Sequence, residues 1–170
     1  AAYAGVIAPL VTATCRKLGL ALPRLVVEPG RAIVGQAGVA LYRVGVVKDI
    51  PGVRRYVAVD GGMADNIRPA LYGSRYEAVL ANRVGEPEAG VVTIAGKFCE
   101  SGDILVRDIS LPEVAPGDIV AIPDCGAYCL PMASNYNASL KPAIVMVKDG
   151  QARLIRRRET VEDLLLTDLG

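Results

Sequence analysis

The sequence contains no histidine, and this absence removes several classes of chemistry. Without an imidazole the chain cannot build a Ser-His-Asp triad, a Cys-His dyad or a metal site with a histidine ligand. Few residue types remain for acid and base catalysis.

Excess charge and long apolar runs are also missing. The 19 Lys and Arg residues against 18 Asp and Glu residues leave a net charge of +1, so bulk charge gives no reason to expect nucleic acid or an anionic membrane as a partner. The longest apolar runs, such as residues 119–122 and 143–147, are far shorter than the roughly 20 residues that cross a bilayer. We expect a globular protein with one well-buried core, and no membrane partner.

Cysteine is sparse, and its spacing is poor for a metal site. Of Cys15, Cys99, Cys125 and Cys129, only the last two lie close together, and no second pair completes a zinc site. An apolar-rich chain of this length needs no disulfide staples and shows no secretory segment, so we predict free thiols, no metal and a cytoplasmic location. Seven tyrosines, one phenylalanine and no tryptophan make up the aromatic residues, and we expect some tyrosines to contact a ligand.

The first part of the chain has the pattern of an α/β unit. Apolar residues at helical spacing over residues 3–18 predict a helix with Gly19 as its C-terminal cap. Because Pro9 fits best in a first turn, we expect the regular helix to begin there. Residues 25–27 form a short apolar run that predicts a strand buried in a parallel sheet. Such a strand needs neighbours that this chain does not offer, so we expect residues 1–37 to be the end of a larger α/β domain.

From residue 38 onward the pattern is that of an all-β domain. Valine-rich runs are broken by Gly, Pro, Asp and Asn at residues 39–47, 55–60, 76–82, 91–95, 104–106, 118–122, 143–147 and 152–156. Short strands with frequent turns predict a closed or nearly closed antiparallel β-barrel or sandwich over residues 38–170, with a short helix at 159–166. Asp149 and Gly150 predict a type I′ hairpin turn. The fold class is therefore mainly β.

Five segments carry residues that strands do not need, and the first is Glu-Pro-Gly-Arg at 28–31. It follows a predicted buried strand, where open sheets and βα-barrels place their active sites. Pro29 stiffens the turn and Gly30 lets the backbone approach a ligand, while Glu28 and Arg31 supply opposite charges. A turn with an internal ion pair explains this pattern equally well.

The second segment is Arg-Pro-Ala-Leu-Tyr at 68–72. Pro69 suits the first position of a short helix, which places Arg68 at its entrance and Tyr72 one turn later. The guanidinium and the phenol can then converge on one carboxylate. The plainer alternative is a capped surface turn.

The third segment, Cys-Glu-Ser-Gly-Asp at 99–103, places a thiol and a carboxylate beside a tight turn. A thiol with a pKa of about 8.5 is protonated near neutral pH and can donate a proton to a nearby carbanion. A small buried cysteine before a turn is the alternative. The fourth and fifth segments, residues 124–128 and 132–137, put small residues ahead of a tyrosine, which indicates loops packed closely against a neighbour or a purely structural tyrosine.

Together, the five segments resemble the C-terminal half of the diaminopimelate decarboxylases. This branch belongs to the alanine-racemase-like, pyridoxal-phosphate-dependent decarboxylases, whose fold is a βα-barrel followed by a β-barrel domain. The resemblance implies that residues 1–37 are the last unit of the cofactor-binding βα-barrel and that residues 38–170 are the β-barrel domain. The matching strings are EPGRAIV at 28–34, VAVDGGMADNIRPALY at 57–72, CESGD at 99–103, GDIVAIPDCGAY at 117–128 and MASNYN at 132–137. The strings CESGD and RPALY favour the diaminopimelate branch over the ornithine decarboxylases.

The resemblance implies a cofactor site for pyridoxal 5'-phosphate. Glu28 would face the pyridine nitrogen and keep it protonated, which makes the ring a strong electron sink. Gly30 and Arg31 would lie at the phosphate and at the substrate carboxylate. Tyr128 would reach both the phosphate and the substrate.

The resemblance also implies a substrate site and a homodimer. Arg68 and Tyr72 would hold a carboxylate of meso-2,6-diaminopimelate, and Glu100 would pair with an ammonium group. Cys99 would donate the proton that replaces the lost carboxylate, so that L-lysine and carbon dioxide are formed. Cys99 and Glu100 would act in the active site of the neighbouring subunit.

One feature of the family is missing. None of the five lysines, Lys17, Lys48, Lys97, Lys141 and Lys148, stands in the context of the family's Schiff-base lysine, so we expect the chain by itself to be inactive. Two alternatives remain open at this point. One is a decarboxylase for ornithine, arginine or carboxynorspermidine, and the other is a non-catalytic β-barrel oligomerisation module.

Overall fold

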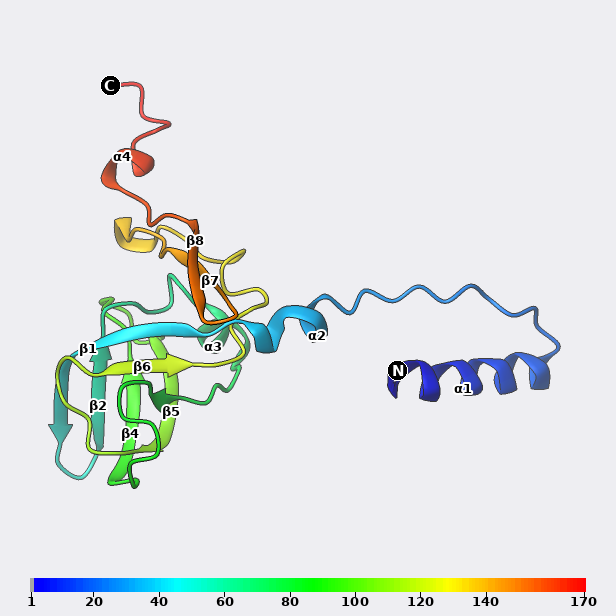
Figure 1. Cartoon of the computed structure of the whole chain (residues 1–170), viewed down its shortest axis with the longest axis horizontal. Helices are drawn as coiled ribbons and strands as arrows, with labels where there is room; N and C mark the ends of the chain where they lie inside the picture. The colour runs from blue at the N-terminus through cyan, green and yellow to red at the C-terminus, as the bar shows by residue number, and fades with distance from the viewer. Residues whose placement is uncertain (1) are drawn as a thin grey trace.

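The computed structural model describes residues 2–170 and contains an N-terminal helix, a strongly curved sheet and a separate C-terminal hairpin (Figure 1). The helical elements are α1 (Ala2–Leu18), α2 (Gly30–Val34), η1 (Gly35–Ala37), α3 (Arg68–Tyr72), η2 (Tyr136–Ala138) and α4 (Val161–Leu164). The strands are β1 (Ala40–Ile50), β2 (Arg54–Val59), β3 (Val79–Leu80), β4 (Gly90–Ala95), β5 (Ile104–Leu111), β6 (Ile119–Ile122), β7 (Ile144–Lys148) and β8 (Gln151–Arg156). The prediction of a mainly β fold is confirmed.

Helix α1 ends as its sequence predicts but begins earlier. Gly19 has a φ of +65° and the N–H of Leu20 donates to the Cys15 carbonyl at 2.9 Å, the bond that closes a glycine-capped C-terminus. Pro9 lies inside the helix and not in its first turn, so that expectation is wrong. A proline removes only one backbone N–H donor, and the helical hydrogen bonds of the turns on either side remain. No helix within residues 2–170 is long and apolar enough to cross a membrane.

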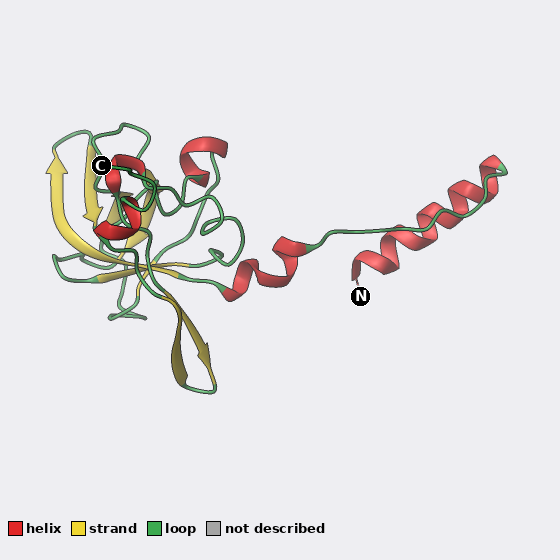
Figure 2. Ribbon diagram, turned by 90° about the horizontal axis from the view of Figure 1, so that it is seen from above, coloured by secondary structure: helices red, strands yellow, loops and turns green. Residues whose placement is uncertain are grey.

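Residues 25–27 do not form the predicted strand. They lie in the segment without regular structure that joins α1 to α2, and all three apolar side chains are exposed. Figures 1 and 2 show this segment extended, with α1 held away from the sheet. The physical reason is that a parallel strand takes its hydrogen bonds from neighbouring strands, and no residue of the described chain pairs with this run.

The sheet is nearly closed and mixed. Its six strands follow the order β3-β6-β1-β2-β4-β5, while β7 and β8 form a two-stranded sheet of their own. Every neighbouring pair is antiparallel except β2 and β4, which run parallel, so the sheet is largely antiparallel, as predicted, with one parallel pair. Parallel neighbours need a long crossover, and residues 60–89, which include α3 and β3, supply it.

The core lies inside the curved sheet. Alternate side chains of β1 and β2 point inward, so Tyr42, Val44, Val57 and Val59 are all buried. The same cluster takes in apolar residues from every other strand of the six-stranded sheet. By contrast, the β7–β8 hairpin is almost wholly exposed. Its turn has positive φ at Asp149 and Gly150, as a type I′ turn requires.

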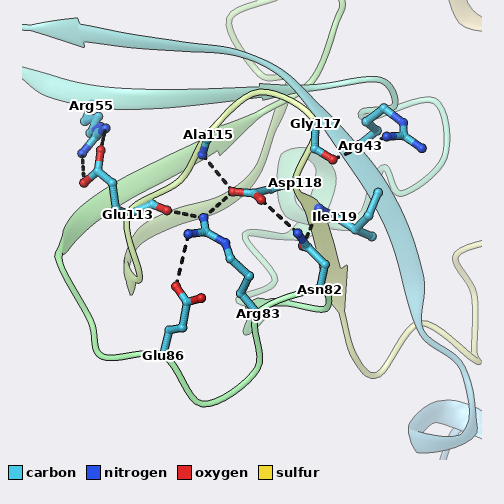
Figure 3. Close-up of polar contacts among 10 residues, drawn as sticks. All are labelled: Arg43, Arg55, Asn82, Arg83, Glu86, Glu113, Ala115, Gly117, Asp118 and Ile119. Atoms are coloured by element: carbon cyan, nitrogen blue, oxygen red, sulfur yellow. Dashed lines mark hydrogen bonds and ion pairs between the residues drawn. The ribbon is translucent and has the colours of Figure 1, made fainter.

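A polar network ties the loop after β3 to the turn before β6 (Figure 3). Arg83 donates to the Asp118 carboxylate at 2.5 Å and to Glu86 at 3.1 Å. Asp118 also accepts from the Ala115 N–H at 2.8 Å and from the Asn82 amide at 3.0 Å. Asp118 is only 7% exposed, so hydrogen bonds from Arg83, Ala115 and Asn82 stabilise its charge in place of water. This network fixes one end of the sheet.

Candidate functional site

Arg68 contacts two aromatic rings. Its guanidinium carbon lies 5.4 Å from the centre of the Tyr72 ring and 5.1 Å from that of Tyr128. Arg68 is the first residue of α3, where its N–H donates to the Asn66 side chain at 3.3 Å, and Tyr72 follows one turn later. The structure therefore brings the second and fourth segments together around one guanidinium, which cation–π contacts orient.

Tyr128 is presented by a loop that packs on the α2–η1 segment. The Gly126 N–H donates to the Gly35 carbonyl at 2.9 Å, and the Cys125 N–H donates to the Gly38 carbonyl at 2.9 Å. A side chain at Gly126 would overlap the Val34 carbonyl oxygen, so only glycine allows this approach. Tyr128 itself has a φ of +68° and is 46% exposed. The fourth segment thus docks directly after the first.

The same loop carries two thiols, those of Cys125 and Cys129. The Cys129 sulfur lies 3.7 Å from the Tyr76 hydroxyl, and Cys129 is buried. A hydrogen bond from the Cys125 thiol, helped by Tyr76 and by the charge of Arg68, lowers the pKa of Cys129 to about 6. The same contact raises the pKa of Cys125. The positive charge of Arg68 thus favours the ionised form of Cys129.

The third segment lies against α3. A side chain at Gly102 would stand 3.7 Å from the Ala70 Cβ, in ordinary contact. The Glu100 carboxylate accepts from the Gly102 N–H at 3.3 Å, and Cys99 is exposed. The structure thus places the thiol and the carboxylate near the helix that carries Arg68, on a tight turn as the sequence predicts.

The fifth segment borders the third. The Tyr136 ring meets the Phe98 ring edge-on, with centres 5.4 Å apart. An open hollow of about 580 Å³ lies beside the Phe98 ring, and the residues that line it include Lys97, Cys99, Asn137 and Arg158. The side chains of Lys97 and Arg158 make this hollow basic, so Cys99 faces a surface suited to an anionic group.

Glu28, Gly30 and Arg31 are exposed, and the side chains of Glu28 and Arg31 form no hydrogen bond or ion pair with residues 2–170. The structure does not bring them into contact with Arg68, although α2 carries the surface on which the Tyr128 loop docks. As a donor set, a carboxylate, a guanidinium, a glycine N–H and a phenol fit a phosphate ester with a protonated ring nitrogen. These residues therefore fit the expected cofactor in their chemistry.

Sequence reasoning missed three residues of this site. Tyr76 and Asn66 support the Arg68 group, and Asp103, the last residue of the third segment, accepts hydrogen bonds from the Met63 and Phe98 N–H groups. Asp103 and Asn66 lie within the strings at 99–103 and 57–72, yet only their burial, at 3% and 2% exposed, separates them from ordinary turn residues. Nothing in the sequence marks Tyr76.

Comparison with known proteins gives a consistent result. The family described as "Pyridoxal-dependent decarboxylase, C-terminal sheet domain" matches residues 11–126. The chain is 53% identical over 167 residues to the diaminopimelate decarboxylase of Bacillus subtilis strain 168, covering 98% of this chain and 38% of that protein. It is 53% identical over 153 residues to the diaminopimelate decarboxylase of Mycobacterium tuberculosis strain H37Rv, covering 87% of this chain and 34% of that protein.

Solved structures agree. The diaminopimelate decarboxylase of M. jannaschii in complex with L-lysine superposes with a TM-score of 0.84 at 40% identity, over 95% of this chain and 36% of that one. A lysine/ornithine decarboxylase from Vibrio vulnificus, at 23% identity and a TM-score of 0.55, shares the fold alone. The chain spans little more than a third of the curated relatives it matches. Since the family match covers most of the chain, the chain belongs to the pyridoxal-dependent decarboxylases, as their C-terminal sheet domain.

Proposed function

We propose that this chain is the C-terminal part of a diaminopimelate decarboxylase, which converts meso-2,6-diaminopimelate to L-lysine and carbon dioxide. The observation that carries the proposal is the convergence of Arg68, Tyr72 and Tyr128 beside the turn of Cys99 and Glu100. This arrangement puts a fixed cation near an exposed carboxylate. A substrate with carboxylates and ammonium groups at both ends is complementary to it.

Arg68 and Tyr72 bind a substrate carboxylate in this proposal. Two ring contacts hold the guanidinium, which forms no ion pair with residues 2–170, so its N–H groups are free to donate to a carboxylate. Glu100 receives a substrate ammonium group. Its carboxylate is held by the Gly102 N–H and the Ser101 hydroxyl, which orients it without neutralising its charge.

Cys99 supplies a proton to the carbon atom that loses carbon dioxide. Its thiol is exposed, and the turn that follows it fixes its backbone through the Asp103 N–H, which donates to the Glu100 carbonyl at 3.1 Å. A thiol positioned beside the reacting carbon is a suitable general acid.

Pyridoxal 5'-phosphate is the proposed cofactor, and it supplies an electron sink for the bond that breaks. Glu28 would hold the ring nitrogen in its protonated form, and Gly30, Arg31 and Tyr128 would bind the phosphate. Arg31 and Tyr128 would also meet the substrate. The docking of the Tyr128 loop on α2–η1 supports this grouping, because it joins the elements that carry these residues.

We further propose a homodimer with active sites at the interface, in the cytoplasm. Cys99 and Glu100 stand on the surface of their own chain, where they can serve the active site of the neighbouring subunit. A two-fold dimer would use the same patch twice. Four cysteines without paired spacing suit a reducing compartment.

The test is to join this chain to the barrel part of a diaminopimelate decarboxylase and to assay each amino acid separately. We expect turnover of meso-2,6-diaminopimelate and none of ornithine, arginine or carboxynorspermidine, since 53% identity ties the chain to the diaminopimelate branch. The 170-residue chain alone, given pyridoxal phosphate, is expected to show neither turnover nor a borohydride-trapped adduct at one specific lysine. Turnover of ornithine in preference to diaminopimelate would refute the proposed substrate.

A further inference from the structure

Asp103 holds a buried carboxylate at the point where two site segments meet. It is 3% exposed and stands directly before β5. One carboxylate oxygen accepts from the Met63 N–H at 2.6 Å, and the other accepts from the Phe98 N–H at 2.8 Å. Met63 belongs to the segment that leads into α3, and Phe98 directly precedes Cys99. One side chain therefore bridges the two segments.

The surrounding backbone is built to admit this carboxylate. A side chain at Gly96 or at Gly62 would overlap the Asp103 carboxylate, so both positions must lack one. The Gly96 N–H also donates to the Asp103 carbonyl at 2.9 Å, and the Lys97 N–H donates to the Gly61 carbonyl at 3.0 Å. A buried charge requires hydrogen bonds to offset its loss of hydration, and backbone N–H groups from two segments supply them here.

A short series of hydrogen bonds connects Asp103 to Arg68. The Asn66 N–H donates to the Gly62 carbonyl at 3.1 Å, which closes the turn that contains Met63. The Asn66 side chain then accepts from the Arg68 N–H at 3.3 Å. On the other side, Phe98 is followed at once by Cys99 and Glu100. A shift of the Asp103 carboxylate would therefore move the two segments relative to each other.

We propose that Asp103 is a positioning residue, which sets Cys99 and Glu100 in place relative to Arg68 through hydrogen bonds accepted from the Phe98 and Met63 N–H groups. The roles of the positioned residues rest on the proposed function, whereas the positioning itself does not. Burial raises the pKa of Asp103 above its usual value, and the two backbone N–H groups oppose this shift. The charged and titratable groups around it are Lys97, Asp65, Glu100 and Tyr42.

The first test is a pH titration of the wild-type 170-residue chain, followed by NMR. The amide protons of Met63 and Phe98 should shift together with the carboxyl carbon of Asp103, because protonation weakens both hydrogen bonds at once. The Gly90 amide, at the far end of β4, serves as the internal control. Met63 and Phe98 amides that do not follow the Asp103 titration would overturn the proposal, and this result needs no variant.

The second test measures thiol alkylation by iodoacetamide, residue by residue, in Asp103→Asn. An amide keeps the shape but can accept from only one of the two N–H donors. We expect the alkylation rate of Cys99, corrected for its own titration, to change at least threefold, while the rates of Cys125 and Cys129 stay constant. The matched control is Asp108→Asn on the same strand, which contacts Arg54 and Thr93.

The outcomes separate positioning from general stability. A merely structural role would raise the reactivity of all the thiols together, and an unchanged Cys99 in a folded Asp103→Asn chain would overturn the proposal. In the complete decarboxylase, Asp103→Asn should lower kcat about tenfold or more while the pH profile keeps its shape. If the wild-type enzyme does not act on diaminopimelate, the proposed function fails, whereas the NMR and alkylation results still decide the role of Asp103.

Discussion

The guanidinium of Arg68 stacks on the ring of Tyr128, with 5.1 Å between the guanidinium carbon and the ring centre, although the two residues belong to distant segments. The contact forms because Gly126 docks its loop on the α2–η1 segment and so delivers Tyr128 to α3. Tyr72 adds a second ring at 5.4 Å. The orientation of Arg68 thus depends on three parts of the chain at once.

Replacing Arg68 should weaken substrate binding. In the complete decarboxylase, Arg68→Ala would leave a substrate carboxylate without its charged partner. We expect KM to rise and kcat/KM to fall by an amount that corresponds to about 2–4 kcal/mol of lost binding free energy. Arg68→Lys keeps the charge but loses the flat, two-pronged donor, so its effect should be intermediate. Steady-state kinetics on both variants give the measurement, and an unchanged KM in Arg68→Ala would contradict the assigned role.

Replacing Cys99 should affect the chemical step instead. Cys99→Ala removes the proposed general acid, so kcat should fall by roughly 10²- to 10⁴-fold with little change in substrate affinity. Cys15→Ala, which removes a thiol from α1, is the control and should keep full turnover. A Cys99→Ala enzyme with normal kcat would show that the thiol only packs, and Tyr128, a lysine or water would then be the donor.

The sequence predicts local features of this fold well. The glycine cap at residue 19, the hairpin turn at Asp149 and Gly150, and the helix that begins at Arg68 all follow from the conformational preferences of single residues. The five segments can also be recognised, because their residues do not follow the pattern of a strand. Each of these depends on neighbours within a few positions, which a sequence displays directly.

Other features depend on contacts that the sequence does not display. Residues 25–27 have the composition of a strand, but a strand forms only where a partner supplies hydrogen bonds. The parallel pairing of β2 with β4 follows from a crossover whose path is set by tertiary packing. Likewise, the contact of Cys129 with Tyr76 joins two segments that share no motif.

Gly126 should tolerate no side chain. Gly126→Ala would push a methyl group into the Val34 carbonyl, and such overpacking is expected to lower the free energy of unfolding by about 1–3 kcal/mol. Gly90→Ala is the matched control, because nothing lies within 4 Å of a side chain at that position. Urea unfolding of the two variants gives the comparison. Equal midpoints would mean that the loop relaxes without cost.

Asp118 should make the free energy of unfolding depend on pH. Burial raises the pKa of Asp118, but hydrogen bonds from the Ala115 N–H, Asn82 and Arg83 outweigh that effect and leave the pKa below its usual value. A lowered pKa stabilises the folded state above the unfolded-state value of about 3.9, and this contribution is lost as the pH falls through the folded-state pKa. Asp118→Asn should therefore be less stable than wild type at pH 7.

The difference between the two proteins should shrink as the pH drops below about 4, because the unfolded wild-type carboxyl then takes up a proton while the folded one still carries its charge. Thermal unfolding between pH 7 and pH 3 measures it. Asp168→Asn, at an exposed position near the C-terminus, is the control and should follow the wild type throughout. A difference that stays constant with pH would show that Asp118 acts through shape and not through charge.

Cys125 should control the acidity of Cys129. The Cys125 thiol donates a hydrogen bond that lowers the pKa of Cys129 to about 6, so Cys125→Ala should return it toward the usual thiol value of about 8.5. Thiolate absorbance at acid to neutral pH, where the tyrosines stay protonated, follows this titration. Cys15→Ala is the control and should leave the low titration step in place.

The same pair should give the wild type a maximum of stability near pH 8.5. The lowered pKa of Cys129 stabilises the folded state above about 8.5, and that contribution is lost as the pH falls through about 6. The raised pKa of Cys125 acts in the opposite direction, because above about 8.5 the unfolded chain can ionise this thiol while the folded chain cannot. Urea unfolding from pH 5 to pH 10 should therefore show a peak that is lost in Cys125→Ala. A wild-type curve without that peak, or a Cys129 that titrates near 8.5, would mean that the two sulfur atoms do not share a hydrogen bond.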